Sequence, residues 1–330
     1  MMTTFKTISP GLSLTVITGL AALFLSEHYH APAMLFALLL GIAMSFTYQD
    51  TKCKAGIEFA ACSVLRIGVA LLGLRIAFSD LVSLGWQTIA LLASAIISTI
   101  LIGLVLAKLL GLKKSFGALT GGSVAICGAS AAMAITAILP DHKNKERDTL
   151  LTVIGVTSLS TIAMVVYPIV ATYLGFDNEQ AGLFLGGTIH DVAQVVGAGY
   201  SISEDTGDIS TLVKLVRVSM LMPVVMVMLF IIKRHNQSIS SDVKAAKVPL
   251  FLIAFVALMI INSCFNVPTI IIETSTEVSR FALVTAIAAI GMKSNLAKLT
   301  SVGIKPIIMM IIETVWIAVF ILTYIYLHSL

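Results

Sequence analysis

The sequence has few charged residues and no long polar region. Asp, Glu, Lys and Arg make up 12% of the 330 residues, 58% are hydrophobic, and the mean hydropathy is +1.01. Soluble domains carry about 25% charged residues. The longest polar stretch, Lys233 to Lys247, is far shorter than the ~50 residues that a separate soluble domain needs. We therefore predict a single integral membrane domain over residues 1–330.

Cysteine motifs and the common catalytic motifs are also missing. The cysteines at positions 53, 62, 127 and 264 form no CxxC pair, so we expect neither a disulfide framework nor a metal site. The chain has no GxxxxGK[ST] phosphate-binding loop and no GxSxG nucleophile motif. We expect no cofactor and no enzymatic activity. The net charge of +4 comes from basic loops, so a nucleic-acid partner is not expected.

What the chain does have is a series of apolar segments. Each approaches the ~20 residues that cross about 30 Å of hydrocarbon as a helix. The pattern predicts an all-α polytopic membrane protein. The segments are 8–26, 31–48, 56–79, 86–110, 116–139, 149–173, 181–200, 209–232, 248–265, 278–297 and 305–327.

Two of these segments resemble one another. They read GALTGGSVAICGASAAMA (Gly117–Ala134) and GLFLGGTIHDVAQVVGAG (Gly182–Gly199). Aligned without gaps, Gly117, Gly121 and Gly122 fall on Gly182, Gly186 and Gly187. Glycine weakens helices, and broken backbone persists in a bilayer only where protein buries it or where it lines a cavity. A matched pair of Gly-interrupted segments is typical of a transporter's binding site. We predict that segments 116–139 and 181–200 are re-entrant or broken helices.

The basic residues favour a particular topology. If all 11 segments cross with the N-terminus inside, the basic loop 140–148 faces outward and the loop 175–180, without a basic residue, faces inward, against the positive-inside tendency. Both conflicts disappear if the two Gly-rich segments are re-entrant from opposite faces. This predicts about 9 spanning helices plus an inverted pair, with a cytoplasmic N-terminus and a periplasmic C-terminus. The alternative, 11 full spans, stays open.

The paired glycines are the first candidate substrate-binding residues. Broken helices expose N–H groups and about half a positive charge at their amino ends, which favours anions. Permissive backbone next to a hydroxyl suits an oxyanion, and the alternative is close helix packing through GxxxG spacing. The candidates are Gly121, Gly122 and Ser123 in the first segment and Gly186, Gly187 and Thr188 in the second.

Ionisable residues, together with the nearby Gln194, form the second candidate group, because charged and polar groups are costly in a membrane and therefore usually functional. His190, Asp191 and Gln194 are predicted to couple ion movement, since a histidine titrates near neutral pH; a purely local clamp is the alternative. Lys214 and Arg217 are predicted to bind the anion. Their alternatives are snorkelling of Lys214 and pairing with Asp191. For Arg66, Arg280 and Glu313, ion pairing and coupling both stay open.

Three stretches carry a resemblance to a known family. They are CGASAAMAI (Cys127–Ile135), GGTIHDVAQVVGAGY (Gly186–Tyr200) and LVKLVRVSMLMPVV (Leu212–Val225). With these runs the chain resembles the YeiH-like bacterial membrane proteins, which are grouped as sulfate exporters, over nearly its whole length. The resemblance implies a multi-pass inner-membrane exporter of sulfate or sulfonate-derived anions. It assigns no residue roles.

The combined prediction is a secondary active transporter of a small anion, proton-coupled and working as an exporter in the lipid bilayer. One alternative is a cation/proton antiporter in which Asp191 binds Na⁺ or H⁺. A remote alternative is an intramembrane enzyme that uses Ser123 or Ser130 with His190. The sequence leaves the oligomeric state open, a homo-oligomer included.

Overall fold

The computed structural model describes residues 2–29, 32–76, 79, 82, 84–140, 144–235, 249–265, 267–294 and 303–328. Within these ranges every regular element is a helix, which confirms the predicted all-α class. Residues 141–143, 236–248 and 295–302 lie outside the described residues. They include basic residues on which the predicted topology depends, Lys143 and Lys298 among them.

The chain divides into two compact units. The first comprises Met1–Gly85, Val196–Ile209 and Pro249–Asn295, and the second comprises Trp86–Val195, Ser210–Val248 and Leu296–Leu330. Both units are helical. That the whole chain forms one membrane domain stays a prediction.

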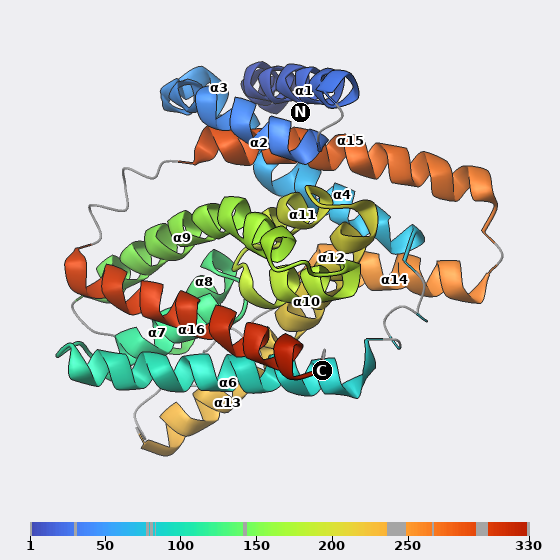
Figure 1. Cartoon of the computed structure of the whole chain (residues 1–330). Helices are drawn as coiled ribbons and strands as arrows, with labels where there is room; N and C mark the ends of the chain where they lie inside the picture. Colours follow the sequence, from blue (N-terminus) through green and yellow to red (C-terminus); the bar gives the residue numbers. More distant parts are fainter. Residues whose placement is uncertain are drawn as a thin grey trace. The chain divides into compact units, whose positions relative to one another are not determined.

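Most helices of the first unit come from two of its sequence ranges, Met1–Gly85 and Pro249–Asn295 (Figure 1). Asp50 caps the amino end of the helix that begins at Thr51, because its side chain accepts a hydrogen bond from Lys52 N at 3.0 Å. The elements are α1 (Met2–Tyr29), α2 (Ala33–Ala43), the 3₁₀ helix η1 (Ser45–Gln49), α3 (Thr51–Phe59), the π-helical η2 (Ala60–Val64), α4 (Leu65–Leu71), the 3₁₀ helix η3 (Leu72–Leu74), α14 (Leu250–Cys264) and α15 (Thr269–Lys293).

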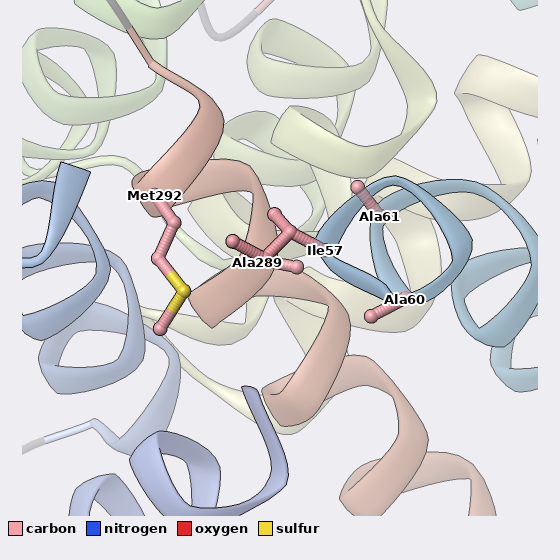
Figure 2. Packing of buried hydrophobic residues seen from close by; sticks show 5 residues of the cluster. All are labelled: Ile57, Ala60, Ala61, Ala289 and Met292. Carbon is pink, nitrogen blue, oxygen red and sulfur yellow. The ribbon is translucent and has the colours of Figure 1, made fainter. Parts of the chain in front are cut away.

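Small residues hold the helices of the first unit close together. A Cβ atom added to Gly41 would lie 2.2 Å from the Ala288 carbonyl oxygen, so α2 and α15 touch through their backbones. Figure 2 shows the neighbouring core, in which Ile57 and the alanines of η2 meet Ala289 and Met292 of α15. Such small-residue contacts are the usual means of helix association in membranes.

Within the first unit, Arg75 at the end of η3 forms ion pairs with two carboxylates. Arg75 Nη1 lies 3.0 Å from Glu204 Oε2, and Arg75 Nε lies 2.8 Å from Asp208 Oδ2. The Tyr200 hydroxyl donates a hydrogen bond to Asp208 Oδ1. The cluster therefore links Arg75 to the turn that joins α11 (Val192–Tyr200) to α12 (Glu204–Ser219).

The second unit contains both Gly-rich segments up to Val195 and the cationic part of α12 from Ser210 onward. Its other elements are α6 (Gly85–Leu109), α7 (Lys114–Ala125), α8 (Ala129–Ile138), α9 (Lys145–Tyr173), α10 (Asn178–Thr188), α13 (Leu221–His235) and α16 (Ile304–His328), all labelled in Figure 1.

Among the described residues, 7 helical stretches are long and apolar enough to cross a membrane, which confirms a polytopic protein. Two predicted spans contain shorter helices, since α2 has 11 residues and α14 has 15. Whether these shorter helices also cross stays a prediction, as does the choice between 9 and 11 spans. The long stretches are Thr7–Tyr29, Lys52–Leu74, Gly85–Leu109, Lys145–Tyr173, Glu204–Ile232, Thr269–Lys293 and Ile304–His328.

Candidate binding site at two helix breaks

Both Gly-rich segments are interrupted helices, as predicted. In the first, α7 ends at Ala125 and α8 begins at Ala129. In the second, α10 ends at Thr188 and α11 begins at Val192. Gly128 has φ 62°, a left-handed conformation that strains residues with a side chain. The first break therefore depends on a glycine.

The first segment folds back on itself as a hairpin. A Cβ atom added to Gly122 in α7 would lie 2.3 Å from Ile135 Cδ1 in α8. In one straight helix these two residues would stand about 20 Å apart. The two ends of the hairpin, near Lys114 and Ile138, therefore lie on the same side of the break, which is the geometry expected of a re-entrant segment.

The two breaks meet inside the second unit. A Cβ atom added to Gly128 would lie 3.6 Å from His190 Cβ. Lys214 Nζ joins both breaks by donating to Ile126 O at 2.6 Å and to Ile189 O at 2.9 Å. We call this place the break junction and define it as residues 126–128, residues 189–191, Lys214 and Arg217.

Arg217 binds the carboxyl ends of both half-helices. Its Nε and Nη2 donate to Ala125 O at 2.9 Å and Val124 O at 3.0 Å, at the end of α7. Its Nη1 donates to Gly186 O at 3.0 Å and Ile189 O at 3.2 Å, at the end of α10. The last carbonyls of a helix lack partners within the helix and carry partial negative charge. Arg217 and Lys214, both with 0% exposure, supply the missing donors.

This geometry shows which helix ends the glycine pairs occupy. Gly121–Ser123 and Gly186–Thr188 lie in the last turns of α7 and α10, the ends at which a helix presents carbonyls rather than N–H groups. The amino ends that favour anions belong to α8 and α11, which begin three residues or more after each pair. Sequence reasoning found the interrupted segments and the nearby cations, but placed the amino ends too early.

The first glycine of each pair lies where two helices cross closely. A Cβ atom on Gly121 would lie 3.0 Å from Ile100 Cα, and one on Gly186 would lie 2.4 Å from Ser210 O. The second glycines, Gly122 and Gly187, face the side chains of Ile135 and Ile321 instead. These contacts favour close packing as the role of Gly121 and Gly186. Substrate binding by the glycines stays a prediction.

The hydroxyls next to the glycine pairs are engaged within their own helices. Ser123 Oγ donates to Leu119 O at 2.5 Å, and Thr188 Oγ1 donates to Phe184 O at 2.6 Å. Both residues have 0% exposure. In this conformation their hydrogens are not directed at a substrate. No hydrogen bond joins Ser123 or Ser130 to His190 within the described chain.

His190 and Asp191 lie in the second break. Ser160 Oγ of α9 accepts from both of their backbone N–H groups, at 3.2 and 3.1 Å. Thr314 Oγ1 of α16 donates to Met310 O and lies 3.0 Å from His190 Nε2. The hydroxyl hydrogen is thus used, so we assign the imidazole hydrogen to Nε2. His190 Nδ1 is buried without a partner among the described residues.

Gln194 and Asp191 complete this side of the junction. Gln194 Nε2 donates to Thr161 Oγ1 at 2.9 Å, and its Oε1 is buried without a partner in the described structure. Asp191 Oδ1 accepts from Ala193 N at 3.0 Å, so this half-buried carboxylate caps the amino end of α11. Their predicted coupling role is not tested by this geometry.

The positive charge at the junction is not balanced by ion pairs. Across the described residues, neither Lys214 nor Arg217 forms a salt bridge with a carboxylate; the ion pairs found involve Arg75. Lys214 bonds to Ile126 O, two residues before Gly128, and Gly128, the capping residue of α8, offers no side-chain hydrogen bond. Ala129 is half-buried and Ser130 is exposed. The junction therefore presents an uncapped helix amino end near two buried cations.

Three partners of the site, Ser160, Thr161 and Thr314, were not found from the sequence. Hydroxyl residues in apolar helices usually bond to their own preceding turn, so these positions carry no distinctive signal. Arg66 and Arg280, which sequence reasoning left open, are exposed in the first unit. Glu313 is fully buried in the second unit and bonds to Thr120.

Comparisons with known proteins show what the chain is similar to. A UPF0324 membrane protein of Chlorobaculum tepidum is 51% identical over 319 residues, which cover 96% of this chain and 89% of that protein. The UPF0324 membrane protein TauZ of Paracoccus denitrificans is 50% identical over 314 residues, covering 94% and 93%. The solved sodium proton antiporter MjNhaP1 from Methanocaldococcus jannaschii is 15% identical, over 95% of this chain and 97% of that one. Its TM-score of 0.30 is too low to argue for a common fold.

The family described as Conserved hypothetical protein 698 matches residues 10–310. This match agrees with the resemblance seen in the sequence. Together with the identities above 50% over most of both chains, it shows that the chain belongs to the UPF0324 family of multi-pass membrane proteins.

Proposed function

We propose that this protein is a secondary transporter of a small anion and that the anion binds at the break junction. One observation carries the proposal. Lys214 and Arg217 are fully buried, form no ion pair within the described residues, and lie beside the uncapped amino end of α8. A matched pair of interrupted helices is typical of transporter binding sites.

The charges at the junction favour an anion. Each helix end carries about half an elementary charge. The carboxyl ends of α7 and α10 offset about one of the two cations. The amino ends of α8 and α11 together add about one positive charge, which Asp191 offsets. About one positive charge is then left without a counter-charge, and a bound anion would neutralise it.

The same contacts argue against a cation at this place. Transporter sites for Na⁺ use unwound backbone carbonyls and the carboxyl ends of half-helices as ligands. Here those carbonyls already accept hydrogen bonds from Lys214 and Arg217, Ile126 O and Ile189 O among them. A cation at the junction would have to displace a buried ammonium or guanidinium. We therefore favour the anion transporter over the cation/proton antiporter.

The substrate class and direction rest on the sequence resemblance. We propose a sulfate or sulfonate-type oxyanion as substrate, export as the direction and an ion gradient as the energy source. Three oxygens on such an anion suit the spare hydrogens of Lys214 and Arg217 together with the N–H groups of α8.

Replacing Lys214 tests this proposal. In proteoliposomes with purified protein, we expect uptake of labelled sulfate or methanesulfonate, and Lys214→Met should reduce it at least about tenfold, because a charged hydrogen-bond donor is lost. Lys214→Arg should retain more activity. Lys293→Met changes an exposed lysine of α15 and serves as the matched control.

Two results would contradict the anion proposal. One is a flux that requires sodium and ignores every anion offered, which would favour the antiporter. The other is wild-type anion uptake by Lys214→Met in correctly inserted protein, which would remove the junction as the site.

We further propose an inner-membrane location with a cytoplasmic N-terminus and a periplasmic C-terminus. The hairpin of α7 and α8 supports the proposed orientation, because the basic residues Lys114 and Lys145 flank the hairpin on one side. In a variant without its native cysteines, Asn144→Cys should react with a membrane-impermeant thiol reagent from the cytoplasm and Asn178→Cys from the periplasm. Labelling of either position from the opposite side would show that this topology is wrong.

A further inference from the structure

Glu313 is a buried carboxyl group that forms no ion pair within the described part of the chain. It lies in α16 of the second unit and has 0% exposure. Its Oε1 lies 2.9 Å from Thr120 Oγ1 of α7, and its Oε2 has no hydrogen-bond partner among the described residues. A Cβ atom on Gly103 of α6 would lie 2.7 Å from Oε1. Three helices therefore enclose the group, and its side chain is out of contact with bulk solvent.

The neighbouring helices bring no ionised side chain into contact with Glu313. On α6 and α7 the ionisable groups are Lys108 and Lys114, each more than one helical turn from the contact. On α16, Lys305 instead donates to Leu110 O at 3.1 Å. The charged residues of α9 and α10 lie in their first turns. His190 reaches α16 through the contact of its Nε2 with Thr314 Oγ1 at 3.0 Å.

The hydrogen-bond geometry suits a protonated acid. An unpaired carboxylate in such a place is very costly. If Oε1 carries the proton, it donates to Thr120 Oγ1, and the Thr120 hydroxyl then donates to Phe116 O at 3.2 Å. These two hydrogen bonds use the carboxyl hydrogen and the Thr120 hydroxyl hydrogen, and they leave only the carbonyl oxygen Oε2 unpaired. A carboxylate would instead compete with Phe116 O for the single Thr120 hydrogen.

We propose that Glu313 is the proton-binding site of the transport cycle, holding a proton in this conformation and releasing it in another. The proposal rests on the proposed anion transport. Glu313 lies close to the break junction along α16, because the next residue, Thr314, bonds to His190 in the junction. Thr120 lies in the same helix as Ala125, whose carbonyl binds Arg217. Hydrating a Glu313 carboxylate requires α16 and α7 to separate, which changes both contacts at the junction.

Infrared spectroscopy of the purified protein tests the protonation directly and does not depend on transport. We expect the C=O stretch of a protonated carboxyl group at neutral pH in the wild type. The band should be lost in Glu313→Gln and shifted in Thr120→Val, which removes its hydrogen-bond partner. Glu277→Gln, the same change at an exposed carboxylate of α15, should leave it unaltered. An identical band in Glu313→Gln overturns the proposal, and Thr120→Val decides if Glu313→Gln fails to fold.

Flux in proteoliposomes tests the coupling. Glu313→Gln should still move the anion, while its response to an imposed pH gradient should fall to about a tenth of the wild-type response or less. A Glu313→Gln flux that follows the gradient as the wild type does overturns the coupling role and leaves anion transport intact. If the wild type moves no anion, the proposed function fails, and the infrared band alone then decides whether Glu313 holds a proton.

Discussion

Arg217→Met is expected to lower the stability of the folded protein, in addition to any loss of contact with the substrate. The change leaves four carbonyl contacts at the ends of α7 and α10 without their donor. A buried polar group without a partner costs about 1–3 kcal/mol, and a hydrogen bond to a charged group contributes about 1.5–3 kcal/mol. We expect a clear fall in the unfolding temperature in detergent, measured by tryptophan fluorescence, with loss of anion uptake. Both tryptophans, Trp86 and Trp316, lie in the second unit.

Two further variants separate charge from geometry. Arg217→Lys keeps the charge but loses the planar fork that reaches both helix ends, so it should recover only part of the stability. Arg280→Met makes the same change at an exposed arginine and should be nearly neutral. If Arg217→Met unfolds like the wild type and loses only anion affinity, then Arg217 contacts the substrate and does not hold the helix ends.

The Arg217 contacts explain why two helices can break in an apolar interior. Without the cations, the carboxyl ends of α7 and α10 would each bring about half a negative charge to the buried break junction. Lys214 and Arg217 neutralise them and donate to the free carbonyls. The cations in turn are tolerated because those carbonyls replace water. Each feature is costly alone, and the breaks and the cations stabilise one another.

The sequence was sufficient to predict the helical class, the two interrupted segments and the presence of Lys214 and Arg217 near them. It could not fix the position of each break. The glycine pairs at 121–122 and 186–187 were natural candidates, yet both stay helical, because glycine also serves close packing. The first break occurs at Gly128, which alone in that segment has a positive φ among the described glycines. A single sequence does not distinguish these two uses of glycine.

The polar partners of the site were beyond prediction for a different reason. Thr314 contacts His190 across 124 positions of the sequence, and Ser160 contacts it across 30. No local pattern encodes such pairings, because they depend on how α9 and α16 pack against the breaks. Glu313 was visible as an ionisable residue in an apolar span. Only the structure shows that, among the described residues, it bonds to a hydroxyl and not to a cation.

Gly186→Ala and Gly187→Ala should have very different effects although they are the same change at adjacent positions. The new methyl group of Gly186→Ala would lie 2.4 Å from Ser210 O and 2.8 Å from Val213 Cβ. Relief requires α12 to move away from α10, which carries Lys214 and Arg217 away from the break carbonyls. Overpacking of this kind costs about 1–3 kcal/mol, and we expect anion binding to be lost as well.

Gly187→Ala provides the matched control, because the nearest atom to its methyl group would be Ile321 Cδ1 at 3.4 Å, an ordinary contact with a side chain. In a helix, alanine is also favoured over glycine by up to about 1 kcal/mol. Unfolding temperature and anion affinity, measured for both variants in one detergent, should therefore fall for Gly186→Ala and stay near wild type for Gly187→Ala. The opposite order, with normal stability but no anion affinity in Gly187→Ala, would mean that this glycine lines the anion site and that the paired motif binds the substrate directly.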